Sequence, residues 1–188
     1  MRRTANTEEP PERTGEAFEL GERLTVVGER LRAGAAAPAF TLDWLAQPDG
    51  ATSQVRLSDT SGSKRLLNVI NSIDTPVCRI ETRSWEDRLA EQAAEGEVQL
   101  YTISMDLPFA LAARGAREQD GTGHLLLSAH RSERFGRDYG VLVKEWRLLQ
   151  RAVFVIDRHD RLAHVEYVAD QMAEPDYQAA LTALAELP

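Results

Sequence analysis

A nearly continuous apolar run, RLLNVI, occupies residues 65–70 of the chain. A strand with one solvent-exposed face alternates apolar and polar residues, whereas an unbroken apolar run is typical of a strand that is buried on both faces of a sheet. The run therefore predicts a central strand in a sheet that has helices packed against both of its faces.

An amphipathic helix is predicted to follow this strand over residues 76–94. One set of its residues recurs at helical spacing and is expected to pack against the sheet: Val77, Ile80, Ser84, Trp85 and Leu89. Most of the charged residues fall elsewhere around the helix. The segment is therefore expected to have one packed face and one solvated face.

Periodicity and turn residues predict the remaining elements. Strands are expected at 18–20, 24–27, 40–43, 55–57, 98–104, 152–156 and 162–168, a short apolar run at 125–127, and helices at 109–119, 132–139 and 175–187. The first two strands form a predicted N-terminal β-hairpin, and the last two form a second hairpin. The fold class is α/β, with a mixed central sheet flanked by helices.

The first 16 residues are polar and charged, with two adjacent prolines, so they are expected to form a flexible tail. Residues 17–188 are expected to form one domain, because a chain of this length can bury one sizeable core.

Charge and composition narrow the classes of partner. The 30 acidic and 22 basic residues give a net charge of -8, which disfavours binding to nucleic acid or to an anionic membrane. No apolar stretch is long enough to cross a bilayer, and the first residues lack the apolar region of an export signal. A cytoplasmic location is therefore expected.

The chain has one cysteine, Cys78. A single thiol excludes an intrachain disulfide, a CxxC redox pair and a multi-thiolate zinc site. The four histidines show no metal-binding spacing, so no metal site is predicted. Any cysteine chemistry in this chain must use one thiol.

Cys78 lies at the junction between the buried strand and the helix. Thr75 is a good N-cap and Pro76 suits the first helical position, so Cys78 falls in the first helical turn. Free backbone N–H groups and the helix dipole there favour the thiolate, the form of cysteine that acts as a nucleophile. The alternative is that Cys78 is a small buried hydrophobic residue.

Four sequence blocks resemble the thiol peroxidase branch of the peroxiredoxin family. They are Ser72-Ile-Asp-Thr75-Pro-Val-Cys78, Met105-Asp-Leu-Pro-Phe-Ala110, Arg151-Ala-Val-Phe-Val-Ile-Asp157 and Glu174-Pro-Asp-Tyr-Gln-Ala-Ala180. The resemblance extends over residues 24–187 and keeps the family's spacing between blocks. It implies a thioredoxin-like (peroxiredoxin) fold, a homodimer, and reduction of hydrogen peroxide or organic hydroperoxides without a metal or a bound cofactor.

The resemblance also implies residue roles. Cys78 would attack the peroxide and become a sulfenic acid. Thr75 would hydrogen-bond the thiolate and the peroxide, and Arg151 would stabilise the thiolate and the charge on the leaving oxygen. Read without the resemblance, Thr75 is a helix cap and Arg151 a surface charge. Glu81 and Arg83 are expected at solvated helix positions.

Two departures from the family pattern stand out. The family's active-site motif is Pro-x-x-x-Thr-x-x-Cys, and Asn71 occupies the position of its proline. Asn71 is a candidate for binding the substrate. Typical family members carry, in the helix predicted here at 109–119, a second (resolving) cysteine that forms a disulfide with the first. This chain has no cysteine there, and Gly115 lies at about that position. The sulfenic acid would then be resolved by an external thiol, by Cys78 of another chain, or not at all.

The sequence therefore predicts a one-cysteine, thiol-dependent peroxidase. Its reductant would be a thioredoxin-like protein or a low-molecular-weight thiol. The alternative is a peroxiredoxin-fold protein with weak or no turnover that serves as a redox sensor or a binding module.

Overall fold

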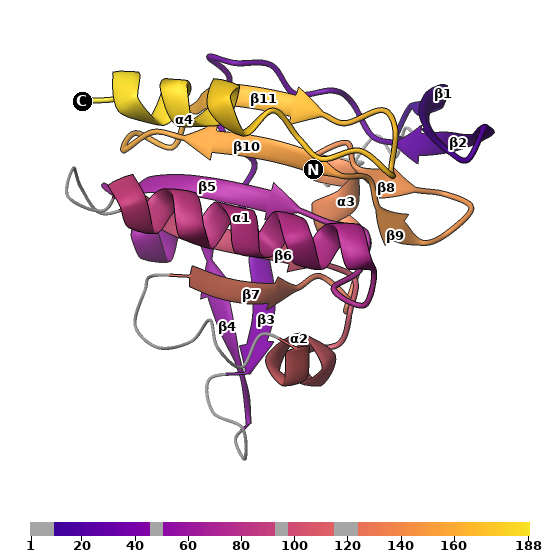
Figure 1. Cartoon of the computed structure of the whole chain (residues 1–188), viewed down its shortest axis with the longest axis horizontal. Coiled ribbons are helices and arrows are strands. Elements are labelled where there is room, and N and C mark those ends of the chain that lie inside the picture. The colour runs from indigo at the N-terminus through magenta and orange to yellow at the C-terminus, as the bar shows by residue number, and fades with distance from the viewer. Residues whose placement is uncertain (1–9, 46–50, 93–97, 115–123) are drawn as a thin grey trace, which may run out of the picture.

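A computed structural model describes residues 10–45, 51–92, 98–114 and 124–188, and a mixed sheet forms its centre (Figure 1). Its strands are β3 (Thr41–Leu45), β4 (Thr52–Arg56), β5 (Lys64–Val69), β6 (Val98–Ser104), β7 (His124–Ser128), β10 (Ala152–Ile156) and β11 (Leu162–Tyr167). They lie in the order β11-β10-β5-β6-β7-β3-β4. β5, β6 and β7 are parallel, and the other neighbours are antiparallel.

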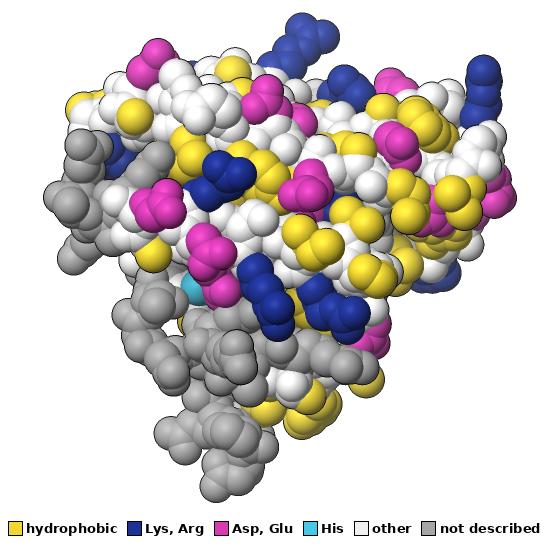
Figure 2. Space-filling view, viewed as in Figure 1, with side chains coloured by type: hydrophobic (Ala, Val, Ile, Leu, Met, Phe, Trp, Pro, Cys, Tyr) yellow, Lys and Arg dark blue, Asp and Glu magenta, His cyan; other side chains and the backbone are white. Residues whose placement is uncertain are grey.

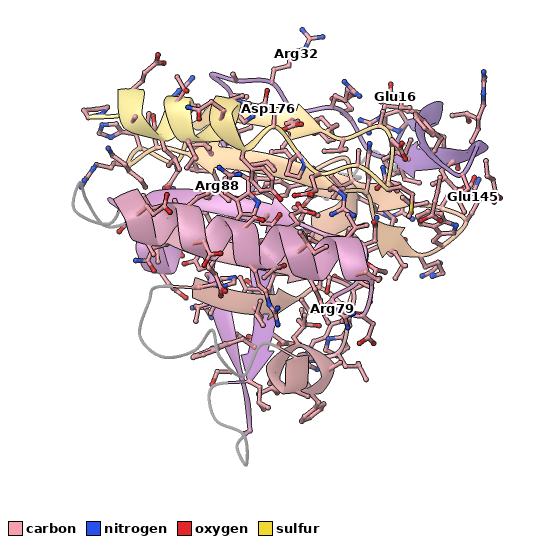
Figure 3. The ribbon with its side chains drawn as sticks, viewed as in Figure 1. Glu16, Arg32, Arg79, Arg88, Glu145 and Asp176 are labelled. Carbon is pink, nitrogen blue, oxygen red and sulfur yellow. The ribbon has the colours of Figure 1, made fainter. Side chains whose placement is uncertain are left out.

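Helices cover both faces of this sheet, as the apolar run at 65–70 predicts. α1 (Pro76–Gln92) and α4 (Tyr177–Glu186) lie side by side on one face, where Arg88 of α1 stands 4.5 Å from the ring centre of Tyr177 (Figure 3). α3 (Arg134–Asp138) covers the other face, and α2 (Pro108–Arg114) packs beside β7 and β3.

The neighbouring residues Leu66 and Leu67 of β5 show how the two faces are filled. Leu66 packs into a cluster with Trp85 and the apolar side of α4, whereas Leu67 packs into the cluster that contains Phe135 of α3. Both leucines are fully buried. β5 is therefore a strand covered on both sides, which confirms the prediction from its composition.

A second, smaller sheet contains the predicted N-terminal hairpin. Its strands are β1 (Glu12–Glu19), β2 (Glu22–Val27), β8 (Leu142–Val143) and β9 (Leu148–Leu149), in that order. Leu20 and Gly21 form the turn of the hairpin, both with positive φ (48° and 87°), the conformation that two-residue hairpin turns require. The predicted tail extended to residue 16, but β1 begins at Glu12, because its residues pair with β2 as far as Val27. Residues 1–9 of that tail lie outside the described part of the chain.

Most predicted elements are present with shifted ends. The strand at 98–104 matches β6, and the strands at 152–156 and 162–168 match β10 and β11. The helix at 109–119 corresponds to α2, whose described part ends at residue 114, and its remainder falls outside the described residues. Residue 57 begins a short 3-10 helix (Leu57–Thr60) and is not the end of a strand. β8 and β9 were not predicted, since two residues are too few to show a period.

The packed face of α1 differs from the predicted one. Ile80 was expected to be buried but is 54% exposed, whereas Glu81 was expected in solvent and is completely buried. The buried side of the helix follows Cys78, Glu81, Thr82 and Trp85, which keeps the helical spacing but turns the face by one position. Within the described residues, no helix is long and apolar enough to span a membrane.

Candidate active site

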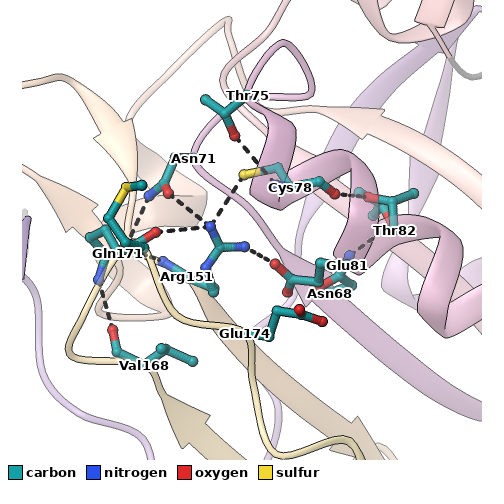
Figure 4. A network of polar contacts seen from close by, with 12 residues as sticks. Asn68, Asn71, Thr75, Cys78, Glu81, Thr82, Arg151, Val168, Gln171 and Glu174 are labelled. Carbon is teal, nitrogen blue, oxygen red and sulfur yellow. Dashed lines mark hydrogen bonds and ion pairs between the residues drawn. The ribbon is translucent and has the colours of Figure 1, made fainter.

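The pairing of β5 with β10 brings two distant segments to one end of the sheet. The strands are antiparallel, and Val69 pairs with Ala152. Asn71 lies two residues beyond Val69, and Arg151 directly precedes Ala152, so both residues lie at this end. α1 starts at the same place, and Figure 4 shows Asn71, Cys78 and Arg151 converging there.

The loop before α1 is fixed by Asp106, which follows β6. Its carboxylate accepts hydrogen bonds from Ser72 Oγ and from the Ile73 backbone N–H, both at 2.8 Å, and from Ser104 Oγ at 2.7 Å. Three donors to one carboxylate hold residues 72–73 against the end of β6. This carboxylate therefore fixes the position of the chain that leads into α1 in the structure.

Thr75 caps α1, as predicted. Its Oγ1 accepts a hydrogen bond from the Cys78 N–H at 3.3 Å and donates one to Ser72 O at 3.2 Å. Cys78 thus lies in the first turn of the helix, where unpaired N–H groups favour an anion. The same Thr75 hydroxyl lies beside the residue that carries the thiol.

Cys78 is completely buried. It belongs to a small apolar cluster with Ile70, Ile73, Leu111 and Leu126. The interpretation of Cys78 as a buried residue therefore holds, but this cluster does not enclose the sulfur entirely, since a charged group also reaches it.

That group is the guanidinium of Arg151. Its Nη2 donates to Cys78 Sγ and to Asn71 Oδ1, each at 3.4 Å, and to the backbone oxygen of Gln171 at 3.0 Å. Arg151 is completely buried, so the interpretation as a surface charge is wrong. The guanidinium therefore lies against the sulfur inside the protein, where it can contact a charge that develops on the sulfur or beside it.

Glu81 forms a buried ion pair with Nη1 of Arg151. The side chains of the two residues are 0% and 1% exposed, which overturns the prediction of a solvated Glu81. Arg83 is exposed, as expected. The sequence contained one signal for the position of Glu81 in the site. Glu81 lies three residues after Cys78, and this spacing places both residues on one side of the helix.

Asn71 is held by its own amide group. Nδ2 donates to Leu149 O at 2.7 Å and to Gln171 Oε1 at 3.0 Å, so Oδ1 is the atom that faces Arg151. Both amide hydrogens are therefore engaged away from the sulfur. Gln171, which this amide contacts, was not identified from the sequence, because it lies 100 residues from Asn71 and in no recognisable motif.

The side chains at this site indicate the chemistry that it can perform. Among the described residues, no three His, Cys, Asp or Glu side chains are grouped to hold a metal ion. His124 is buried between Glu86 (2.6 Å) and Thr102 (3.0 Å), away from this site, as a hydrogen-bonded core histidine. The arrangement offers one nucleophilic sulfur and one cation beside it, which suits attack on an electrophile that releases an anion.

Sequence comparison identifies relatives of this chain. The Redoxin family model matches residues 32–181. The thiol peroxidase of Oceanobacillus iheyensis is 42% identical over 166 residues, covering 86% of this chain and 93% of that protein. The thiol peroxidase of Halalkalibacterium halodurans is also 42% identical, covering 87% of this chain and 93% of that protein.

Solved structures share the fold. A peroxiredoxin-like protein from Aquifex aeolicus superimposes with a TM-score of 0.78 at 28% identity, covering 96% of this chain and all of that one. A thiol peroxidase from Chromobacterium violaceum gives the same TM-score at 24% identity, covering 90% of this chain and 95% of that one. The expected thioredoxin-like (peroxiredoxin) fold with an N-terminal hairpin is confirmed.

Proposed function

Since the chain belongs to the thiol peroxidase branch of the peroxiredoxins, within the Redoxin family, we propose that it reduces hydrogen peroxide or organic hydroperoxides through Cys78 alone. The observation that carries the proposal is the 3.4 Å contact between Arg151 Nη2 and the only thiol of the chain, at the start of a helix. The enzyme is an oxidoreductase of the thiol peroxidase type.

The first half of the reaction is a displacement on oxygen. The Cys78 thiolate attacks the terminal oxygen of the peroxide, an S–O bond forms, and the O–O bond breaks. The sulfur loses two electrons and becomes a sulfenic acid, while the leaving hydroxide or alkoxide takes up a proton and departs as water or an alcohol. Arg151 stabilises the charge on the leaving oxygen, and the Thr75 hydroxyl orients the peroxide beside the sulfur.

The second half requires a thiol from outside the chain. An external thiol attacks the sulfenic sulfur, water leaves, and a mixed disulfide forms. A second thiol then releases Cys78 and carries away the disulfide. A thioredoxin-like protein or a low-molecular-weight thiol fits this role. Because Cys78 has no exposed surface, the chain around it must move to admit the external thiol, as it must to admit the peroxide.

A homodimer and a cytoplasmic location are part of the proposal. Ile80 (54%), Leu107 (54%) and Phe109 (61%) are exposed near the site, and Figure 2 shows hydrophobic side chains over the first turns of α1 and over α2. A second copy of the chain would cover these side chains. Sedimentation tests this: the parent should sediment as a dimer, and the Phe109→Asp variant should shift towards the monomer. The cytoplasm supplies thiols and keeps a lone thiol reduced.

A redox sensor is the second candidate. It is favoured by Asn71 at the position of the family's proline and by a sulfur that has no second cysteine in the chain to close onto. Such a protein would be oxidised once per molecule and would not turn over.

Peroxide consumption by reduced protein tests the two candidates. The peroxidase is expected to consume many equivalents of hydrogen peroxide or cumene hydroperoxide with dithiothreitol or a thioredoxin system, and Cys78→Ser is expected to consume none. A dimedone-type reagent should label Cys78 in the absence of reductant. One equivalent consumed, with label, would favour the sensor. An unmodified thiol after excess peroxide would refute both candidates.

A further inference from the structure

Gln171 occupies a buried position in the segment that leads from β11 to α4 and is 1% exposed. Its side-chain amide is fully used: Nε2 donates to Val168 O at 2.7 Å and to Ala169 O at 3.1 Å. Oε1 accepts from Asn71 Nδ2 at 3.0 Å and from the Arg151 backbone N–H at 2.9 Å. The orientation of this amide is therefore defined by four bonds.

Gln171 holds Arg151 at both ends. The Gln171 side chain binds the backbone N–H of Arg151, and the Gln171 backbone oxygen accepts from Nη2, the nitrogen that also donates to Cys78 Sγ. An arginine side chain has many rotamers when it is free, and the bond from Nη2 to the Gln171 backbone oxygen restricts them. The bond at the Arg151 N–H holds the backbone from which that side chain starts. The guanidinium is thereby kept beside the sulfur.

The segment around Gln171 is itself anchored to the N-terminal hairpin. The Gln171 N–H donates to Phe18 O at 2.9 Å, and the Phe18 N–H donates to Ala169 O at 2.8 Å. Asn71 adds a further link, because its Nδ2 bridges Gln171 Oε1 and Leu149 O. The backbone of residues 169–171 is thus bonded to the hairpin, and the Gln171 side chain is linked through Asn71 to Leu149.

We infer that Gln171 is a positioning residue: through its two anchors on Arg151 it places the guanidinium against Cys78, with Asn71 as its partner. The inference rests on the proposed function for its catalytic meaning. The position of the Arg151 cation relative to the Cys78 sulfur does not depend on turnover, so this part of the inference can be tested without activity.

Gln171→Met tests the side-chain part of the inference, since methionine keeps the unbranched length and removes the four side-chain hydrogen bonds, including the one from the Arg151 N–H. The Gln171 backbone oxygen that accepts from Nη2 is still present, but its position is then no longer fixed by the side chain. The readout is the ultraviolet absorbance of the thiolate against pH, with Cys78→Ser as blank. We expect the absorbance curve of Gln171→Met to lie at higher pH than that of the parent, because the cation is then held less closely against the sulfur. The rate of peroxide oxidation at neutral pH should fall about tenfold or more in parallel.

Gln150→Met is the matched control. Gln150 is also a completely buried glutamine, and its Nε2 also donates to Val168 O, at 3.1 Å. Its side chain makes no described hydrogen bond to Arg151, Asn71 or Cys78. Both variants are expected to lose stability. If the absorbance curve of Cys78 moves along the pH axis only in Gln171→Met, the result supports the role of Gln171 in positioning Arg151. An unshifted midpoint in a folded Gln171→Met would overturn the inference.

A second measurement keeps the inference testable if Gln171→Met does not fold. In the parent protein, a guanidinium with these anchors should give separate, slowly exchanging nitrogen-bound proton signals for Arg151 in NMR spectra. Rapid averaging of those signals would refute the inference. If the parent does not react with peroxide, the proposed function fails, but the titration and the NMR spectra still decide where Gln171 places Arg151.

Discussion

Replacing Glu81 by glutamine should destabilise the fold markedly. Glu81 and Arg151 form an ion pair whose side chains are at most 1% exposed. The variant leaves the Arg151 cation buried with neutral acceptors, chiefly Gln171 O at 3.0 Å and Asn71 Oδ1 at 3.4 Å. Breaking a buried pair by removing one partner costs about 3–5 kcal/mol. For a chain of this size the melting temperature should fall by about 6–20 °C.

Denaturant unfolding of four variants measures this cost. Glu81→Gln and Arg151→Met should each lower the free energy of unfolding, and the double variant should cost less than their sum, because it leaves no unpaired buried charge. Glu91→Gln is the matched control: Glu91 lies on the same helix, is exposed, and should cost no more than about 0.5 kcal/mol when replaced.

Two outcomes would refute this reasoning. Additive costs in the unfolding cycle, or a Glu81→Gln variant as stable as the parent, would show that Glu81 and Arg151 do not form an ion pair in solution.

Other substitutions test the remaining parts of the site and the fold. Arg151→Ala should slow oxidation of Cys78 on the order of 100-fold in stopped-flow assays, because one electrostatic contact to the developing charge is lost; an unchanged rate would remove Arg151 from the reaction. Asn71→Pro should fold, as the family's backbone has proline there, and should change the oxidation rate several-fold, since it deletes the donors to Leu149 O and Gln171; equal rates would mean that Asn71 has no bearing on the chemistry. Hydrogen bonds from Arg137 hold the pKa of Glu133 below its ordinary value of 4.5, so this carboxylate stabilises the fold above that pH and the contribution is lost as the pH falls through the lowered value. Glu133→Gln should therefore flatten the fall in unfolding free energy with acid, and an unchanged slope would contradict this.

Local chemistry made part of the site predictable. The cap at Thr75, the helix start at Pro76 and the place of Cys78 in the first turn depend on residues next to one another in the sequence, and the structure has all three. The strand at 65–70 was predictable for the same reason, since burial on both faces is recorded in its own composition.

The rest of the site could not be predicted, because it depends on contacts between residues that are far apart in the sequence. Glu81 has the sequence signature of a solvated helix residue, and only Arg151, which another strand brings to it, makes its burial favourable. Gln171 carries no pattern at all, because its function in the site depends on a backbone N–H and an amide from two other segments. Neither period nor propensity contains that information.

The separation of Cys78 from its cation along the chain has a consequence for protein synthesis. The thiol is made 73 residues before Arg151, and Gln171 follows still later. At about 5–20 residues per second, translation leaves Cys78 without its guanidinium for about 4–15 s. β5 also lacks its neighbour β10 during that time, so the junction that presents the sulfur is incomplete. A nascent or truncated chain therefore carries a cysteine without its cation, and peroxide reactivity is acquired only when the last fifth of the polypeptide has been added and folded.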